Sequence, residues 1–196
     1  MNKLLIKDAT IINEGKRSIE DIYIEGEFIK KIGVGIKLNN EVETINANGF
    51  LVIPGMIDDQ VHFREPGLTH KGDISTESKA AIAGGVTSYI EMPNTIPNTT
   101  TIEEFNNKIK NASNNSFANF SFMFGGTNDN IDEIKKIDKS EVAGIKLFLG
   151  SSTGKMLIDN REAIENIFMS TSLPISAHCE DEQTIKDNTD YYTDLY

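Results

Sequence analysis

From about residue 50 onward, the sequence alternates between short apolar runs and segments with helical periodicity. The apolar runs have the length and the β-branched or aromatic content of buried strands. They lie at residues 51–62, 86–91, 120–124, 142–149 and 174–178. Regular alternation of strand and helix predicts a parallel sheet with right-handed crossovers.

Helix-start signals separate these runs. Ser75, Thr101 and Asp159 are predicted N-caps, and Glu104 completes a capping box with Thr101. The predicted helices cover residues 75–83, the segment after residue 101, residues 130–137 and residues 159–168. Residues 1–50 instead read as short strands at residues 4–6, 10–12, 22–24 and 28–32, with Gly26 in a tight turn between the last two, and predict a separate small β unit.

Composition limits the function classes. The chain has 196 residues, of which 38% are hydrophobic and 25% charged, as in a globular protein. A net charge of -11 argues against a nucleic-acid partner. We expect no membrane association, since no apolar stretch approaches about 18 residues. The single cysteine, Cys179, and the lack of a signal-peptide pattern favour a cytoplasmic location.

Polar residues follow the predicted strands. Gln60, His62 and Arg64 alternate, so strand geometry puts them on one face. The other candidates at strand ends are Asn94, Lys146 and His178. Side chains at the carboxyl ends of parallel strands form the active sites of (β/α)₈ barrels. Such a barrel needs about 250 residues, so we expect a truncated chain with five of eight strands; a complete open sheet is the alternative.

The run from Asp58 through Gln60, His62 and Arg64 resembles the Asp-x-His-x-His-x-Arg motif of the dihydroorotase branch of the amidohydrolase superfamily. Members join a small β-sandwich, built from both chain termini, to a metal-bearing barrel. The resemblance implies that residues 1–50 are the N-terminal share of that sandwich. Residues 51–196 would then be the first part of the barrel, truncated.

The resemblance also implies a metal site for one or two Zn²⁺ ions. Its ligands would be His62, His178 and Lys146, the last carboxylated by CO₂; no carboxylate in residues 150–154 could replace this carbamate. Gln60 stands where relatives have histidine, and its amide oxygen is a poorer zinc ligand than imidazole. The alternatives are a structural role for each histidine and, for Lys146, a side chain that snorkels out of the barrel.

Arg64 and Asn94 resemble the residues that bind the substrate carboxylate in dihydroorotases, because a guanidinium and an amide can both donate to it. The alternative for Arg64 is an ion pair with Glu65 or Asp59. The implied reaction is the reversible cyclisation of N-carbamoyl-L-aspartate to dihydroorotate in pyrimidine biosynthesis. The proton-transferring aspartate is expected beyond Tyr196, so we expect the 196-residue chain itself to be inactive or nearly so.

Two other functions stay open. The chain could be a non-catalytic partner of another pyrimidine enzyme, as the loss of a ligand at Gln60 favours. It could also belong to another cyclic amidohydrolase of the allantoinase or hydantoinase type, although hydantoinase-like sequences lack residues 64–67 as they stand here. A homodimer and association with a pyrimidine-pathway enzyme are the expected assemblies.

Overall fold

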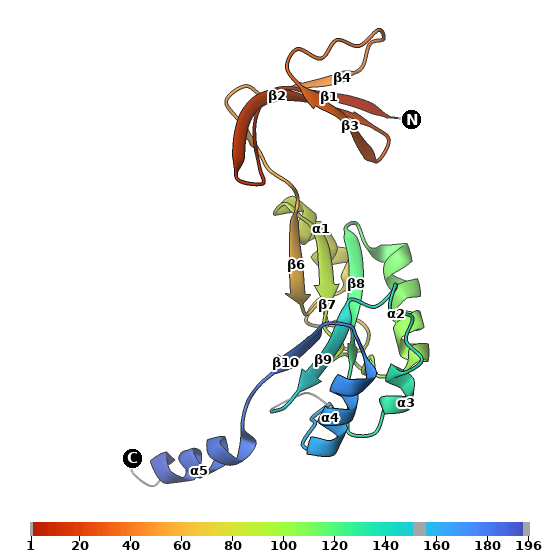
Figure 1. The fold of residues 1–196 in the computed structure, drawn as a ribbon, viewed down its shortest axis with the longest axis vertical. Coiled ribbons are helices and arrows are strands. Elements are labelled where there is room, and N and C mark those ends of the chain that lie inside the picture. Colours follow the sequence, from red (N-terminus) through yellow and green to blue (C-terminus); the bar gives the residue numbers. More distant parts are fainter. Residues whose placement is uncertain (1, 151–155, 194–196) are drawn as a thin grey trace. The chain divides into compact units, whose positions relative to one another are not determined.

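The computed structural model of this chain describes residues 2–150 and 156–193, which fall into two compact units, Met1–Gly55 and Met56–Tyr196. Figure 1 labels their elements. The first unit contains a mixed five-stranded sheet in which β1 pairs with β2, β4 and β5, and β2 pairs with β3. Its strands are β1 (Lys3–Asn13), β2 (Lys16–Glu25), β3 (Phe28–Gly33), β4 (Glu43–Asn46) and β5 (Leu51–Val52).

This first sheet differs from the predicted strands in two places. The predicted strands at residues 4–6 and 10–12 are one strand, β1, whose register with β2 shifts between Ile6 and Ala9. Asp8 adopts a left-handed φ of 56° at that shift, which explains the break in the apolar pattern. Leu51–Val52, predicted as the start of the barrel strand, instead pairs in parallel with β1.

The second unit is built on five parallel strands in the order β10-β9-β8-β7-β6. They are β6 (Met56–Val61), β7 (Val86–Glu91), β8 (Asn119–Gly125), β9 (Gly144–Phe148) and β10 (Ile175–His178). Each strand therefore pairs with its neighbour in the sequence, as consecutive strands of a (β/α)₈ barrel do. This confirms the predicted fold class, the N-terminal part of such a barrel.

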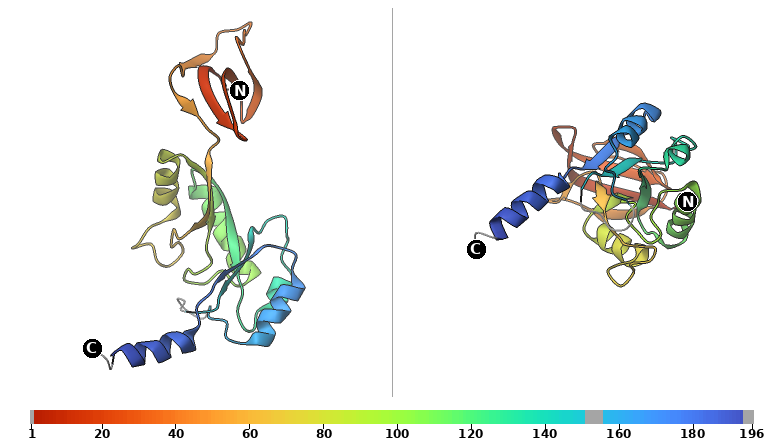
Figure 2. Two further views of the ribbon diagram at one scale, coloured as in Figure 1. Left: turned by 60° about the vertical axis from the view of Figure 1, so that its left-hand side comes forward. Right: turned by 90° about the horizontal axis from the view of Figure 1, so that it is seen from below.

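Helices connect these strands. They are α1 (Ile74–Ala83), α2 (Ile102–Asn115), α3 (Ile131–Ile134), α4 (Arg161–Ser170) and α5 (Glu182–Thr193). Figure 2 shows α1 to α4 on one side of the curved sheet. In the described ranges, no helix is long and apolar enough to cross a membrane.

The helix starts were predicted with mixed success. Thr101 caps α2 as expected, with its Oγ1 accepting from the Glu104 amide. The prediction was wrong for α1 and α4. Asp73, not Ser75, caps α1, and Asn160, not Asp159, caps α4. Both shifts exchange one good capping side chain for another nearby, a choice that the sequence pattern alone does not fix.

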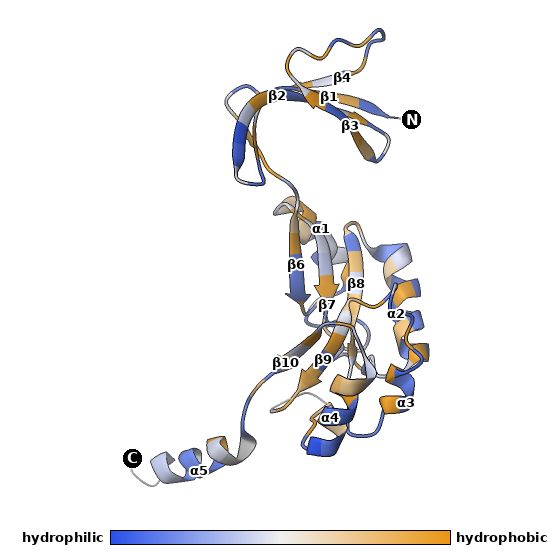
Figure 3. Ribbon diagram, viewed as in Figure 1, coloured by the Kyte–Doolittle hydropathy of each residue, from blue (hydrophilic) through white to orange (hydrophobic). Residues whose placement is uncertain are grey.

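The core of the second unit lies between the sheet and its helices. Its fully buried aromatic and aliphatic members include Ile74, Phe122, Phe124, Ile145 and Leu147. In Figure 3, hydrophobic residues are concentrated in β9, whereas α2 carries both hydrophobic and hydrophilic residues. The apolar face of the amphipathic helix α2 packs toward the sheet through Phe105 and Ala112.

Candidate active site

Lys146 lies on the concave side of the parallel sheet. Its neighbours Ile145 and Leu147 are fully buried in the core, so the alternation of β9 turns Lys146 to the opposite face. The Lys146 Nζ is 3.4 Å from the Gln60 Oε1 on β6, a strand that is not adjacent to β9. Burial lowers the pKa of Lys146. The contact thus places two candidate ligands together, and Lys146 does not snorkel away.

His62 follows β6 and is half-buried. Its Nδ1 is buried without a hydrogen-bond partner in the part of the chain described. Burial is the largest cause that lowers the pKa of His62, and the charge of Arg64 adds to it, while a side-chain hydrogen bond with Asn94 opposes it. Burial thus favours the neutral imidazole of His62, the form in which histidine binds metals, and its Nδ1 is a buried nitrogen without a partner among the described residues.

His178 ends β10, where it pairs with Phe148. Its Nε2 is 3.0 Å from the Glu180 Oε1, and its side chain is half-exposed. The prediction that no carboxylate near residues 150–154 replaces the Lys146 carbamate stays a prediction, because residues 151–154 lie outside the described residues. Within the described ranges, no group of three or more His, Cys, Asp and Glu side chains could hold a metal. A metal site here would therefore depend on Lys146 and on Gln60 as well as on histidines.

The candidate ligands differ in how well they suit a metal ion. The unpartnered nitrogen of His62 and the depressed pKa of Lys146 suit metal ligation and carbamate formation. Gln60 offers only a neutral amide oxygen, and the Nε2 of His178 is engaged by Glu180. The donor set present thus fits one metal position better than two.

Two loops bring Arg64 and Asn94 to His62. The first loop follows β6, and the second follows β7. The Ile96 amide donates to the Pro66 carbonyl at 3.1 Å, which joins the loops. At Gly67, with φ of 82°, a Cβ would collide with the Ile96 carbonyl oxygen. Only glycine allows so close an approach.

Arg64 is not tied up by the acidic neighbours that the sequence offered as alternatives. The Glu65 carboxylate accepts from the Ile74 amide at 2.8 Å, at the start of α1. In the part of the chain described, no ion pair joins Arg64 to Glu65 or to Asp59. Arg64 has a left-handed φ of 73°, which is uncommon for a residue with a Cβ.

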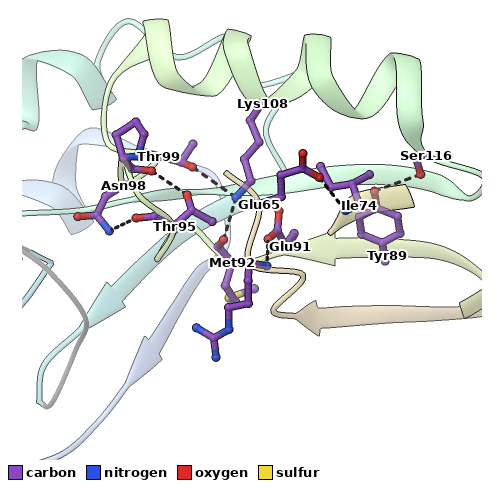
Figure 4. Close-up of polar contacts among 12 residues, drawn as sticks. Glu65, Ile74, Tyr89, Glu91, Met92, Thr95, Asn98, Thr99, Lys108 and Ser116 are labelled. Carbon is purple, nitrogen blue, oxygen red and sulfur yellow. Dashed lines mark hydrogen bonds and ion pairs between the residues drawn. The ribbon is translucent and has the colours of Figure 1, made fainter. Parts of the chain in front are cut away.

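A buried ion pair that the sequence patterns did not predict lies beneath these loops, between Glu91 and Lys108 (Figure 4). The Lys108 Nζ is 2.9 Å from the Glu91 Oε2, and the side chains are 1% and 0% exposed. Burial raises the pKa of Glu91 and lowers that of Lys108, and each partner opposes the shift in the other. One signal was available: Lys108 falls between Phe105 and Ala112 on the buried face of α2.

Comparison with known proteins adds the family. The family model described as "Dihydro-orotase-like" matches residues 49–190. The dihydroorotase of Methanosarcina mazei is 36% identical over 187 residues, which is 93% of this chain and 41% of that protein. The dihydroorotase of Trichlorobacter lovleyi is 45% identical over 96 residues, or 48% of this chain and 23% of its own.

Solved structures agree on the fold. An L-hydantoinase (dihydropyrimidinase) from Arthrobacter aurescens superposes on 100% of this chain and 44% of its own, with a TM-score of 0.93 and 26% identity. A D-hydantoinase from a Thermus species covers 92% of this chain and 41% of its own, with a TM-score of 0.77 and 30% identity. The chain thus spans about two fifths of the length of these relatives. On these matches, the chain belongs to the dihydroorotase-like family.

Proposed function

We propose that the protein carrying this chain is a dihydroorotase, which catalyses the reversible cyclisation of N-carbamoyl-L-aspartate to (S)-dihydroorotate and water in pyrimidine biosynthesis. The observation that carries the proposal is the joining of two loops that bring Arg64 and Asn94 to His62. A guanidinium and a side-chain amide form a site for a carboxylate. Dihydroorotate carries a carboxylate on its ring, at a carbon separated by one CH₂ from the amide carbonyl that reacts.

The same site supports zinc binding by His62, His178 and the carbamate of Lys146, with Gln60 as a weaker candidate. Burial favours the neutral amine of Lys146, the form that reacts with CO₂. When bound, zinc supplies an activated water and polarises a carbonyl oxygen. This chain's own residues bind and orient the substrate: Arg64 and Asn94 hold its carboxylate, so that the ring lies beside His62.

A second candidate is a hydantoinase-type cyclic amidohydrolase, which the TM-score of 0.93 with the A. aurescens enzyme favours. Hydantoin and dihydrouracil are cyclic amides that lack a ring carboxylate. Binding them gives no use to the guanidinium of Arg64. The guanidinium of Arg64, on a loop joined to the loop of Asn94, therefore favours dihydroorotase over this alternative.

Steady-state hydrolysis of dihydroorotate, dihydrouracil and hydantoin by the protein purified from its source cells tests the proposal. A dihydroorotase turns over dihydroorotate in preference to the other two, and Arg64→Met removes that preference. Arg161→Met, on the exposed face of α4, is the matched control and keeps it. Preference for hydantoin supports the second candidate. Absence of turnover with all three, together with absence of bound zinc, supports the non-catalytic partner that Gln60 suggested.

A further inference from the structure

We infer that Glu91 and Lys108 are positioning residues that hold the loops of Arg64 and Asn94 in the arrangement that binds the substrate carboxylate. This inference rests on the proposed function. Neither side chain is placed to touch a substrate, because both are buried between the sheet and α2. Their effect would pass through the backbone of the two loops.

The Glu91 carboxylate supports the first loop. Its Oε1 accepts from the backbone amide of Arg64 at 3.1 Å. The amide of Arg64 is thereby fixed at a residue whose left-handed backbone is otherwise unfavourable. Because the rotamers of an arginine depend on its φ and ψ, this contact sets the direction in which the guanidinium leaves the chain.

The Lys108 ammonium supports the second loop. Its Nζ donates to the Met92 carbonyl at 3.1 Å, two residues before Asn94, and lies 3.5 Å from the Thr99 Oγ1 at the far end of the same loop. The Nζ also lies over the Phe122 ring, 5.1 Å from its centroid. One ammonium group thus contacts both ends of the loop that carries Asn94 (Figure 4).

The ion pair connects these two supports. Buried ion pairs can often be replaced by apolar residues without loss of stability. The stability of the core therefore gives little reason for a glutamate and a lysine at these positions. What an apolar pair could not supply is an acceptor for the Arg64 amide and a donor for the Met92 carbonyl.

A graded set of variants tests the inference. Glu91→Gln keeps both backbone contacts, because an amide oxygen accepts and the amine of Lys108 still donates. Glu91→Gln with Lys108→Met keeps only the contact to Arg64. Glu91→Leu with Lys108→Met keeps neither. Arg161→Met with Glu165→Gln removes an exposed ion pair on α4 and is the matched control.

The readout is the ratio of dissociation constants for dihydrouracil and dihydroorotate, which differ by the carboxylate alone. We expect the ratio to stay at the wild-type value in Glu91→Gln and in the control. We expect it to fall stepwise in the two double variants, by roughly 10- to 100-fold in the variant without either contact. A general loss of structure would weaken the binding of both ligands and leave the ratio of their dissociation constants unchanged.

Each outcome bears on a separate claim. A wild-type ratio in folded double variants, checked by circular dichroism, overturns the inference and leaves the proposed function intact. Failure of the wild-type protein to prefer dihydroorotate overturns the proposed function, and the inference with it. If Glu91→Leu with Lys108→Met does not fold, Glu91→Gln with Lys108→Met still decides, because it replaces both charges by side chains of similar volume.

Discussion

Removing Lys108 alone is expected to destabilise the second unit strongly. Lys108→Met leaves the Glu91 carboxylate, which is 0% exposed, without its counter-charge. Loss of one partner of a buried pair costs about 3–5 kcal/mol. Replacing both partners, as in Glu91→Gln with Lys108→Met, costs far less because no buried charge remains. The single variant should therefore be less stable than the double variant.

The pH dependence of that difference identifies its cause. Burial raises the pKa of Glu91 in the folded state, and Lys108→Met removes the main opposing charge. A group whose pKa is higher in the folded state than in the unfolded state contributes its full stabilisation at pH values below the unfolded pKa. For glutamate the unfolded pKa is about 4.3. As pH rises from the unfolded pKa to the folded one, that stability falls by about 1.4 kcal/mol for each pH unit. The gap between single and double variants should therefore widen from pH 5 to pH 8.

Urea unfolding at each pH measures the difference in free energy of unfolding between the single and double variants. Hydrogen exchange of peptides from residues 86–115 reports the stability of the second unit alone. Arg161→Met, which breaks an exposed ion pair, is the control and should change stability by less than about 1 kcal/mol. Equal stability of the single and double variants at pH 8 would refute the desolvation argument. A gap that does not change with pH would show that packing, not charge, causes the loss.

Four further predictions follow from the structure. Arg64→Met should weaken dihydroorotate binding by about 1.5–3 kcal/mol and leave dihydrouracil binding unchanged in calorimetry. Gly67→Ala should lower both stability and dihydroorotate affinity, because its Cβ would meet the Ile96 carbonyl oxygen; unfolding and binding assays that match wild type would contradict the close approach. The pKa of Asp21 is lowered, chiefly because the Asp8 amide donates to its carboxylate. The stabilisation from this carboxylate is complete above about pH 4 and is lost as pH falls through its folded pKa. In acid titrations of Asp21→Asn, the stability of the first unit should therefore depend less on pH than in wild type. Chelation should abolish turnover, and zinc with bicarbonate should restore it in wild type but not in Lys146→Ala.

Much of the second unit could be predicted from its sequence. Strand β7 matches the predicted bounds, and β8 and β9 lie within about two residues of theirs, because a strand buried on both faces is a continuous apolar run. The inward direction of Lys146 also followed from alternation with Ile145 and Leu147. These features depend on neighbours in the sequence, which a pattern can report.

What the sequence did not predict depends on partners far along the chain. Strands β4 and β5 are short and have few distinguishing residues, and each is defined by its pairing with β1. The Glu91–Lys108 pair escaped because a lysine on a helix is ordinarily solvated, and nothing local shows that a carboxylate lies opposite. The helix α5 was not predicted, since its polar sequence lacks a strong apolar stripe.

The sequential order of the parallel strands has a consequence for synthesis on the ribosome. Every strand of the second unit pairs with the one made just before it, so each new strand and helix can dock onto a sheet edge that already exists. Contacts between near neighbours in sequence close short loops, which favours fast assembly. The nascent chain can therefore pair β6 with β7, and β7 with β8, before Lys146 leaves the exit tunnel.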